Sequence, residues 1–219
     1  MAKGTRAIAY RTNTESGPRP LKVPERIREL SDDALVLAIL SGSDAAFTEL
    51  HWRYRGRLFV FVMEIVGDRE KTEDVIQETF FRIHKHLGRF DRRMKLSTWI
   101  YTIAYRIALN AIRTYRRGTW IILFRDLGEK RNPNDEELEF SNTRLSTERL
   151  CEEEHLRELV ERAVAELPVN FRIIFYMREL EGRTYNEMAR ILGCPVGTAK
   201  NRLHHARKAF AQIIEPMLA

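Results

Sequence analysis

The side chains best suited to chemistry lie near the C-terminus, on a segment predicted to be the last helix of the chain. Between residues 196 and 214, apolar side chains recur at helical spacing. The outward positions hold hydrogen-bonding and basic groups, namely Thr198, Lys200, Asn201, His204, His205, Arg207 and Lys208. Such groups bond to base edges and neutralise phosphates. The segment therefore predicts binding to nucleic acid rather than covalent catalysis.

A helix-turn-helix is predicted to position this segment. Thr184 and Glu187 have the spacing of a capping box, which marks the start of a helix that ends at Gly193. In DNA-binding proteins, the second helix of this motif enters the major groove. A helical hairpin with a solvated outer face is the alternative interpretation. No metal site is expected at His204 and His205, because adjacent helix positions point about 100° apart.

An acidic helix face is predicted in the first half of the chain. The apolar positions of residues 69–87 form one stripe, which leaves Asp74, Gln77 and Glu78 on the outer face. Judged from these residues alone, the face is an ordinary solvated one, because exposed carboxylates are common. A metal-dependent nuclease centre is not predicted, since Glu73 and Asp74 are adjacent and lack a plausible ligand set.

Aromatic and basic side chains follow this acidic helix. They are Phe90, Arg92, Arg93 and Lys95 in a short segment, and Arg106, Asn110 and Arg113 on the outer face of the next predicted helix. Aromatic rings and cations together hold unstacked bases and phosphates. Ser97 or Thr98 is expected to cap the next helix, which runs to about Arg117. Trp99 is interpreted as a core residue, with a DNA contact as the alternative.

The pattern as a whole predicts an all-α fold with two helical domains joined by a flexible linker. Residues 1–30 form a basic N-terminal extension, residues 31–117 the first domain, residues 118–147 the linker and residues 148–219 the second domain. Short loops between the helices of each domain favour antiparallel neighbours.

Composition narrows the class of partner. The 219 residues have a net charge of +6 and an isoelectric point near 9.5, which favours an acidic partner such as nucleic acid. No apolar stretch approaches the roughly 20 residues of a membrane span, and the N-terminus lacks the pattern of a signal peptide. Cys151 and Cys194 are far apart and form no CxxC pair, so a cytoplasmic setting is expected. No cofactor, metal or catalytic site is predicted.

Three segments together resemble the extracytoplasmic-function sigma factors, which consist of little more than a sigma-2 and a sigma-4 domain. Residues 73–80 (EDVIQETF) resemble the polymerase-docking helix of that family, residues 97–104 (STWIYTIA) its promoter-melting segment, and residues 195–203 (PVGTAKNRL) its recognition helix. The resemblance extends from about Ser31 to Glu215. It implies a subunit that initiates transcription together with RNA polymerase core and has no enzymatic activity of its own.

The resemblance also implies a role for each group of side chains. The clamp helices of the polymerase beta-prime subunit are the expected partner of Asp74, Gln77 and Glu78, and the beta flap is a second expected contact. The minus-ten promoter element is the expected partner of Phe90, Arg92, Arg93, Lys95, Arg106, Asn110 and Arg113. The minus-thirty-five element is the expected partner of Arg178, Arg183, Thr184, Thr198, Lys200, Asn201, His204, His205 and Arg207. An anti-sigma factor is expected to mask these surfaces until a signal arrives.

The sequence leaves more than one interpretation for several features. Many relatives have asparagine where this chain has Arg106, so their minus-ten preference does not transfer. The acidic residues 135–139 are either a polar tether or a mimic of RNA in the polymerase channel. The apolar run 120–124 either covers the first domain or contacts a partner. The alternative function is a stand-alone regulator that binds an operator as a dimer, but such a regulator would need a ligand pocket or dimerisation helix in place of the first domain.

Overall fold

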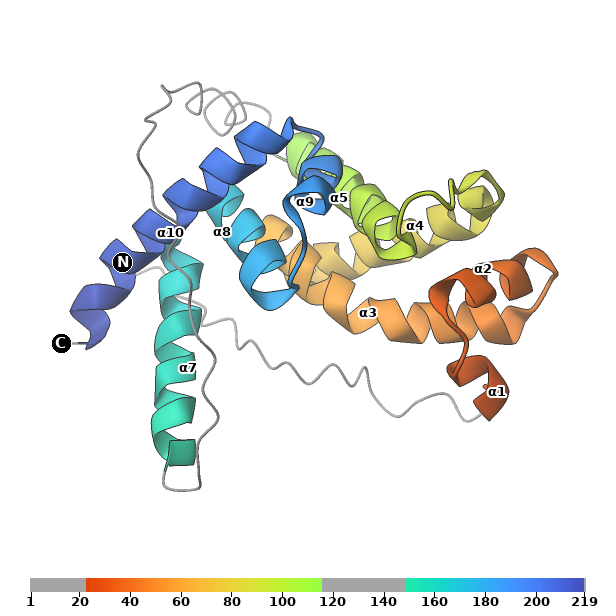
Figure 1. Cartoon of the computed structure of the whole chain (residues 1–219), viewed down its shortest axis with the longest axis horizontal. Coiled ribbons are helices and arrows are strands. Elements are labelled where there is room, and N and C mark those ends of the chain that lie inside the picture. Colours follow the sequence, from red (N-terminus) through yellow and green to blue (C-terminus); the bar gives the residue numbers. More distant parts are fainter. Residues whose placement is uncertain (1–22, 116–148, 219) are drawn as a thin grey trace.

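The computed structural model describes residues 23–115 and 149–218, and the elements that it contains there are helical. The first range forms α1 (Glu25–Arg28), α2 (Asp32–Leu40), α3 (Asp44–Val66), α4 (Arg69–His86), the 3-10 turn η1 (Leu87–Arg89) and α5 (Leu96–Tyr115). The second range forms α7 (Arg149–Glu166), α8 (Val169–Phe175), the π-helical turn η2 (Tyr176–Leu180), α9 (Tyr185–Leu192) and α10 (Val196–Leu218). Figure 1 shows α2 to α5 as a bundle, with α7 to α10 at one end of it. The expected all-α fold is confirmed.

Short polar side chains begin three helices of the first domain. Ser31, Ser43 and Asp68 occupy the N-cap positions of α2, α3 and α4. Each side chain accepts a hydrogen bond from the backbone N–H three residues later, at 3.1 to 3.3 Å. Gly67 ends α3 with a φ of 69°, in the left-handed region that favours glycine. Local sequence therefore sets these boundaries.

The start of α5 differs from the prediction. The N–H of Trp99 already donates to the carbonyl oxygen of Lys95 at 3.2 Å, so helical bonding begins before either expected cap. As a result α5 starts at Leu96, and Ser97 and Thr98 lie within its first turn. Neither residue is therefore the N-cap of this helix.

Residues 23–30, which the sequence assigned to the N-terminal extension, contain α1 and contact α3. Arg53 of α3 donates to the carbonyl oxygens of Arg28 and Leu30, at 3.2 and 3.0 Å. One side chain in α3 thus holds α1 and the approach to α2, a link that apolar periodicity does not reveal. At the other end of the chain, α10 continues beyond the expected end near residue 214 to Leu218.

Some predictions concern residues outside the described ranges. These are the extension up to residue 22, the apolar run 120–124 and the acidic residues 135–139. The described ranges therefore include most of both predicted domains but not the linker. Within those ranges, no helix combines the length and the apolar character needed to cross a bilayer.

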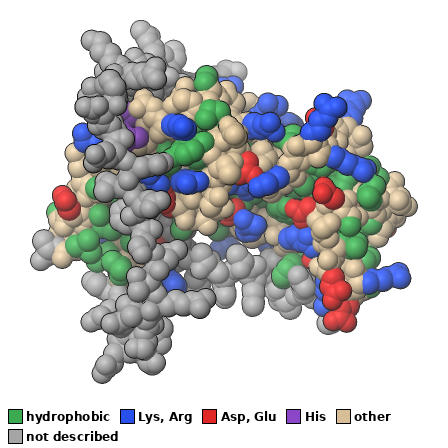
Figure 2. All heavy atoms as spheres, in the orientation of Figure 1, with side chains coloured by type: hydrophobic (Ala, Val, Ile, Leu, Met, Phe, Trp, Pro, Cys, Tyr) green, Lys and Arg blue, Asp and Glu red, His purple; other side chains and the backbone are tan. Residues whose placement is uncertain are grey.

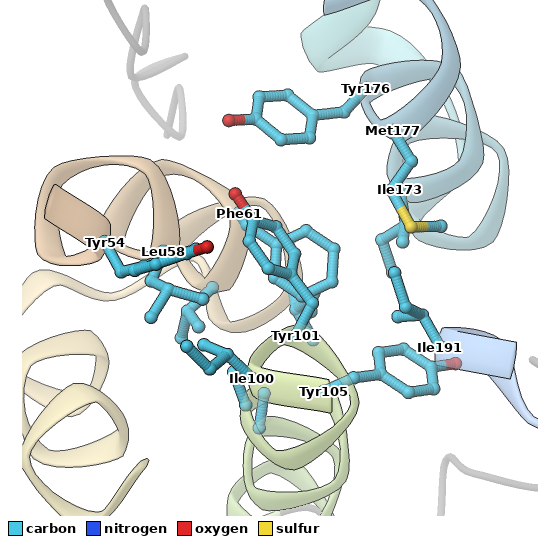
Figure 3. Packing of buried hydrophobic residues seen from close by; sticks show 14 of the residues in the cluster. Tyr54, Leu58, Phe61, Ile100, Tyr101, Tyr105, Ile173, Tyr176, Met177 and Ile191 are labelled. Carbon is cyan, nitrogen blue, oxygen red and sulfur yellow. The ribbon is translucent and has the colours of Figure 1, made fainter. Parts of the chain in front are cut away.

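The two domains share one continuous apolar core. Phe61 of α3 and Tyr101 of α5 are fully buried in the first domain, with ring centroids 4.9 Å apart. Tyr176 of η2, in the second domain, lies with its ring 6.3 Å from the same Phe61 ring. Met177 and Ile191 of the second domain belong to the same cluster of buried residues (Figure 3). Helical periodicity does not indicate this contact, because it identifies a buried face and not the element that covers it.

Candidate nucleic-acid interface

The helix-turn-helix predicted near the C-terminus is present as α9 and α10. The N–H of Glu187 donates to Oγ1 of Thr184 at 3.3 Å, and the N–H of Thr184 donates to Oε2 of Glu187 at 2.8 Å, which completes the capping box. Gly193 has a φ of 65°, and after it the N–H of Cys194 donates to the carbonyl oxygen of Ala189 at 3.0 Å. The cap and the glycine turn thus define where α9 begins and ends.

The α10 helix has one buried face and one accessible face. Its inner residues Ala199, Leu203 and Ala206 are at most 1% exposed. On the opposite face, Lys200 and Asn201 are exposed. They are flanked by half-buried side chains, namely Thr198, His204, His205 and Arg207. The first half of α10 therefore presents the predicted donors and cations to solvent.

Tyr185 brings together two of the predicted cations from different elements. The guanidinium of Arg178 lies 5.2 Å from the centroid of the Tyr185 ring, and the ammonium of Lys200 lies 5.4 Å from it. Both distances are within the range in which a ring face attracts a cation. Arg178 also donates to the carbonyl oxygen of Arg183 at 3.1 Å. These contacts place Arg178 and Lys200 next to the start of α9.

Two other predicted DNA contacts bond to other residues of the protein. Arg183 is 5% exposed, and its guanidinium lies 3.8 Å from the centroid of the Tyr101 ring in the first domain. Arg207 forms an ion pair with Glu179 at 2.9 Å. In this arrangement Arg183 is inaccessible to DNA, whereas Arg207 is half-buried and keeps guanidinium N–H groups beyond those that face Glu179.

The first domain presents a basic surface around α5. Arg106, Asn110 and Arg113 are exposed at spacings of four and three residues along the helix, as predicted. Arg92 and Arg93 are exposed in the loop that precedes α5. In the space-filling view, Lys and Arg side chains gather over α5 and the loop between α4 and α5 (Figure 2). This surface has the charge required for contact with a nucleic-acid backbone.

Phe90 lacks the exposure that its predicted role requires. Its ring is 8% exposed and packs on Trp99 with a centroid distance of 5.2 Å. Trp99 itself packs against the core, as the sequence favoured. The Phe90 ring would have to leave this packing to stack on a base.

Lys95 links this loop to the helix-turn-helix. Its Nζ lies 2.8 Å from Oε1 of Glu187, the capping residue of α9. Burial disfavours the charged form of Glu187, but hydrogen bonds from Lys95 and Thr184 outweigh burial and lower the pKa of this carboxyl below its ordinary value of 4.5. One carboxylate thus caps α9 and neutralises a predicted DNA-binding cation.

The outer face of α4 combines polar and apolar side chains. Asp74 and Gln77 are exposed, and Glu78 pairs with Arg82 at 2.6 Å. Phe81 lies seven residues after Asp74 and four after Gln77, on the same face, and is 61% exposed. Phe81 was not among the residues indicated by the sequence, although its spacing from Gln77 was a usable signal. Aromatic side chains are enriched in protein–protein interfaces relative to the rest of the surface.

A buried polar cluster between the domains was also missed. The side chain of Glu181 is 6% exposed and accepts hydrogen bonds from Arg57 at 2.6 Å, Tyr101 at 3.1 Å, Tyr176 at 3.3 Å and Arg183 at 3.4 Å. We refer to these five residues as the Glu181 cluster. Burial and the nearby Glu181 carboxylate raise the pKa of Tyr101. No sequence spacing signals the cluster, because Arg57 and Glu181 are 124 positions apart.

Comparison with known families identifies both domains. The model "Sigma-70 region 2" matches residues 50–118, and the model "Sigma-70, region 4" matches residues 157–210. The first match includes the α4 face and α5, and the second includes the helix-turn-helix. The two matches occur in the order expected from the resemblance noted in the sequence.

Similar proteins extend over nearly the same length. The ECF RNA polymerase sigma-E factor of Escherichia coli K12 is 31% identical over 191 residues, which cover 87% of this chain and 97% of that protein. The RNA polymerase sigma-H factor of Pseudomonas aeruginosa is 27% identical over 198 residues, which cover 85% and 95%. Both similarities therefore include the two domains and the chain between them.

Solved structures share the fold. CnrH, in complex with the cytosolic domain of CnrY, has a TM-score of 0.56 at 19% identity and covers 83% of this chain and 96% of its own. The sigma factor RpoE of Bartonella quintana, in complex with the anti-sigma factor NepR, has a TM-score of 0.50 at 20% identity, with coverages of 73% and 90%. Two family models in order, together with a relative above 30% identity over almost its entire length, show that the chain belongs to the extracytoplasmic-function sigma factors of the sigma-70 family.

Proposed function

We propose that this chain binds RNA polymerase core and directs it to promoters that contain a minus-ten and a minus-thirty-five element. The main support is that one chain combines an accessible α10 face in a region 4 domain with the mixed α4 face in a region 2 domain. A stand-alone regulator would need only the first of these surfaces. We expect the chain to act in the cytoplasm, where polymerase and promoter DNA are present.

In this proposal α10 enters the major groove of the minus-thirty-five element. Lys200 and Asn201 are its most accessible polar residues and contact base edges, since lysine donates to guanine acceptors and asparagine pairs with adenine. His204 and His205 lie one turn further along the same helix. Contacts from Arg178, Thr184, Thr198 and Arg207 position the helix on the neighbouring backbone.

The basic surface around α5 binds the minus-ten element. Arg92 and Arg93 hold the phosphates of the opened strand, while Arg106, Asn110 and Arg113 face the upstream duplex. Lys95 joins this surface once it is released from Glu187. Phe90 supports the loop by packing on Trp99 and is not part of the contact surface.

The α4 face docks on the clamp helices of the polymerase beta-prime subunit, and the second domain contacts the beta flap. Asp74, Gln77 and Glu78 provide the polar contacts, and Phe81 provides an apolar centre that a protein partner can bury. We further propose that an anti-sigma factor covers these surfaces before a signal arrives. Two solved structures with the same fold were determined with a bound partner, and one of those partners is an anti-sigma factor.

Run-off transcription with purified polymerase core tests the proposal. The template is the promoter of the operon that encodes this protein, and the protein alone is expected to bind that promoter weakly. We expect a defined transcript only when core and this protein are both present. If no transcript exceeds that of core alone, the proposed function is wrong.

Paired variants test the assignment of the two faces. Asp74→Ala should weaken core binding, whereas Lys200→Ala should leave core binding intact and reduce promoter use by about 5- to 150-fold, the effect of about 1–3 kcal/mol. Exposed residues of like charge outside both faces, Asp33 on α2 and Arg162 on α7, serve as matched alanine controls. Equal loss of core affinity in the first two variants would contradict the assignment.

A further inference from the structure

Tyr185, which the sequence did not single out for a role in binding, is the first residue of α9. Its ring is half-buried and packs against the apolar core. Directly before it, the capping box of Thr184 and Glu187 fixes the backbone at the start of the helix. Both the backbone and the ring of Tyr185 are therefore held in place by the fold.

Cations from two other elements lie over this ring. The guanidinium carbon of Arg178, in η2, is 5.2 Å from the ring centroid, and Nζ of Lys200, in α10, is 5.4 Å from it. The face of an aromatic ring attracts cations at such distances, because its quadrupole places negative charge there. One ring thus gathers two positive charges that would otherwise repel each other.

Arg178 has a second anchor next to the ring. Its Nη1 donates to the carbonyl oxygen of Arg183 at 3.1 Å, and Arg183 directly precedes the capping residue Thr184. The guanidinium is thus fixed to the start of α9 by a hydrogen bond as well as by the ring. Because a guanidinium has five N–H groups, this single bond leaves others for a DNA phosphate.

An aromatic ring holds a cation without cancelling its charge. Arg207, by contrast, faces the carboxylate of Glu179 at 2.9 Å, and the two charges offset each other. Lys200 and Arg178 keep their full charge over Tyr185, because the ring has no net charge. Charge of this kind drives DNA binding, since each phosphate that a cation neutralises releases condensed counterions.

We propose that Tyr185 is a positioning residue for promoter recognition, and that its ring holds Lys200 and Arg178 in their binding arrangement before DNA arrives. This inference rests on the proposed function, in which α10 reads the minus-thirty-five element. A lysine side chain that is not held populates many rotamers, and affinity falls with the fraction that is competent to bind. A ring that favours the competent arrangement therefore raises affinity without contact with the DNA.

Equilibrium binding of labelled promoter DNA by holoenzyme, assembled from polymerase core and the full-length chain, tests this role. Tyr185→Leu keeps an apolar side chain but removes the aromatic face, and should weaken promoter binding by about 3- to 10-fold. Tyr185→Phe keeps the ring and should bind within about twofold of wild type. The matched control Phe171→Leu removes another half-buried ring of the same domain, in α8, and should leave promoter binding unchanged.

Two further measurements distinguish positioning from general support of the fold. In the background of Lys200→Ala with Arg178→Ala, the ring has no cation to hold, so Tyr185→Leu should cause no further loss of promoter binding. Promoters with single base changes should also show where preference is lost. Tyr185→Leu should relax preference at the same base pair of the minus-thirty-five element as Lys200→Ala does.

Three results would overturn the positioning role. They are unchanged promoter binding by Tyr185→Leu, a full-sized loss in the background that lacks both cations, and equal losses in Tyr185→Leu and Tyr185→Phe. The last result would mean that the hydroxyl contacts the DNA directly. Failure of the proposed function is distinguishable from all three, because wild-type holoenzyme itself would then show no selective promoter binding.

Discussion

Tyr101→Phe isolates one hydrogen bond in the interface between the domains. The Tyr101 hydroxyl donates to Oε2 of Glu181 at 3.1 Å in a fully buried site. Phenylalanine retains the ring that packs on Phe61 and lies beneath Arg183, so only the hydroxyl is lost. A hydrogen bond to a charged acceptor contributes about 1.5–3 kcal/mol. Because Glu181 keeps its bonds to Arg57, we expect the lower end of this range, about 1.5 kcal/mol.

Thermal unfolding of the full chain measures this loss. A chain of this size loses about 2–4 °C in Tm per kcal/mol, so the Tm of Tyr101→Phe should fall by about 3–6 °C. In the Glu181→Ala background the acceptor is already absent, and the same substitution should cost less than about 0.5 kcal/mol. Tyr105→Phe, a buried tyrosine one turn further along α5, is the matched control and should show no coupling to Glu181. Equal costs of Tyr101→Phe in both backgrounds would refute the proposed bond.

Two other outcomes follow from α9 and its cap. Thr184→Ala removes the capping hydroxyl and should lower the free energy of unfolding by about 1 kcal/mol in urea titrations. The control is Thr48→Ala, because the Thr48 hydroxyl bonds to the carbonyl oxygen of Asp44 within its own helix and caps no helix start. This control should lower the free energy of unfolding by clearly less. Acidification should destabilise wild type more than Glu187→Gln. The pKa of Glu187 is lowered in the folded protein, so its stabilising effect is present above its ordinary value of 4.5 and is lost as the pH falls through the folded value. Urea titrations at about pH 6 and pH 3.5 measure the difference, and equal losses in the two proteins would contradict it.

Local sequence determined the helices and the faces that they present. Thr184, Glu187 and Gly193 predicted the beginning and end of α9, and the structure has the same capping box and glycine turn. The apolar stripe of α4 likewise placed Asp74 and Gln77 on the outer face, where they are exposed. These features depend on residues within one or two turns of each other, so spacing in the chain is sufficient to identify them.

Only the tertiary structure decided which chemically suitable side chains are accessible. Phe90 has the residue type expected for base stacking, but Trp99 covers its ring. Arg183 is suited to a phosphate, but it is buried in the Glu181 cluster. That cluster joins Arg57 to a carboxylate 124 positions later. Burial and ion pairing of this kind depend on how separate helices pack, and helical periodicity contains no information about which two faces meet.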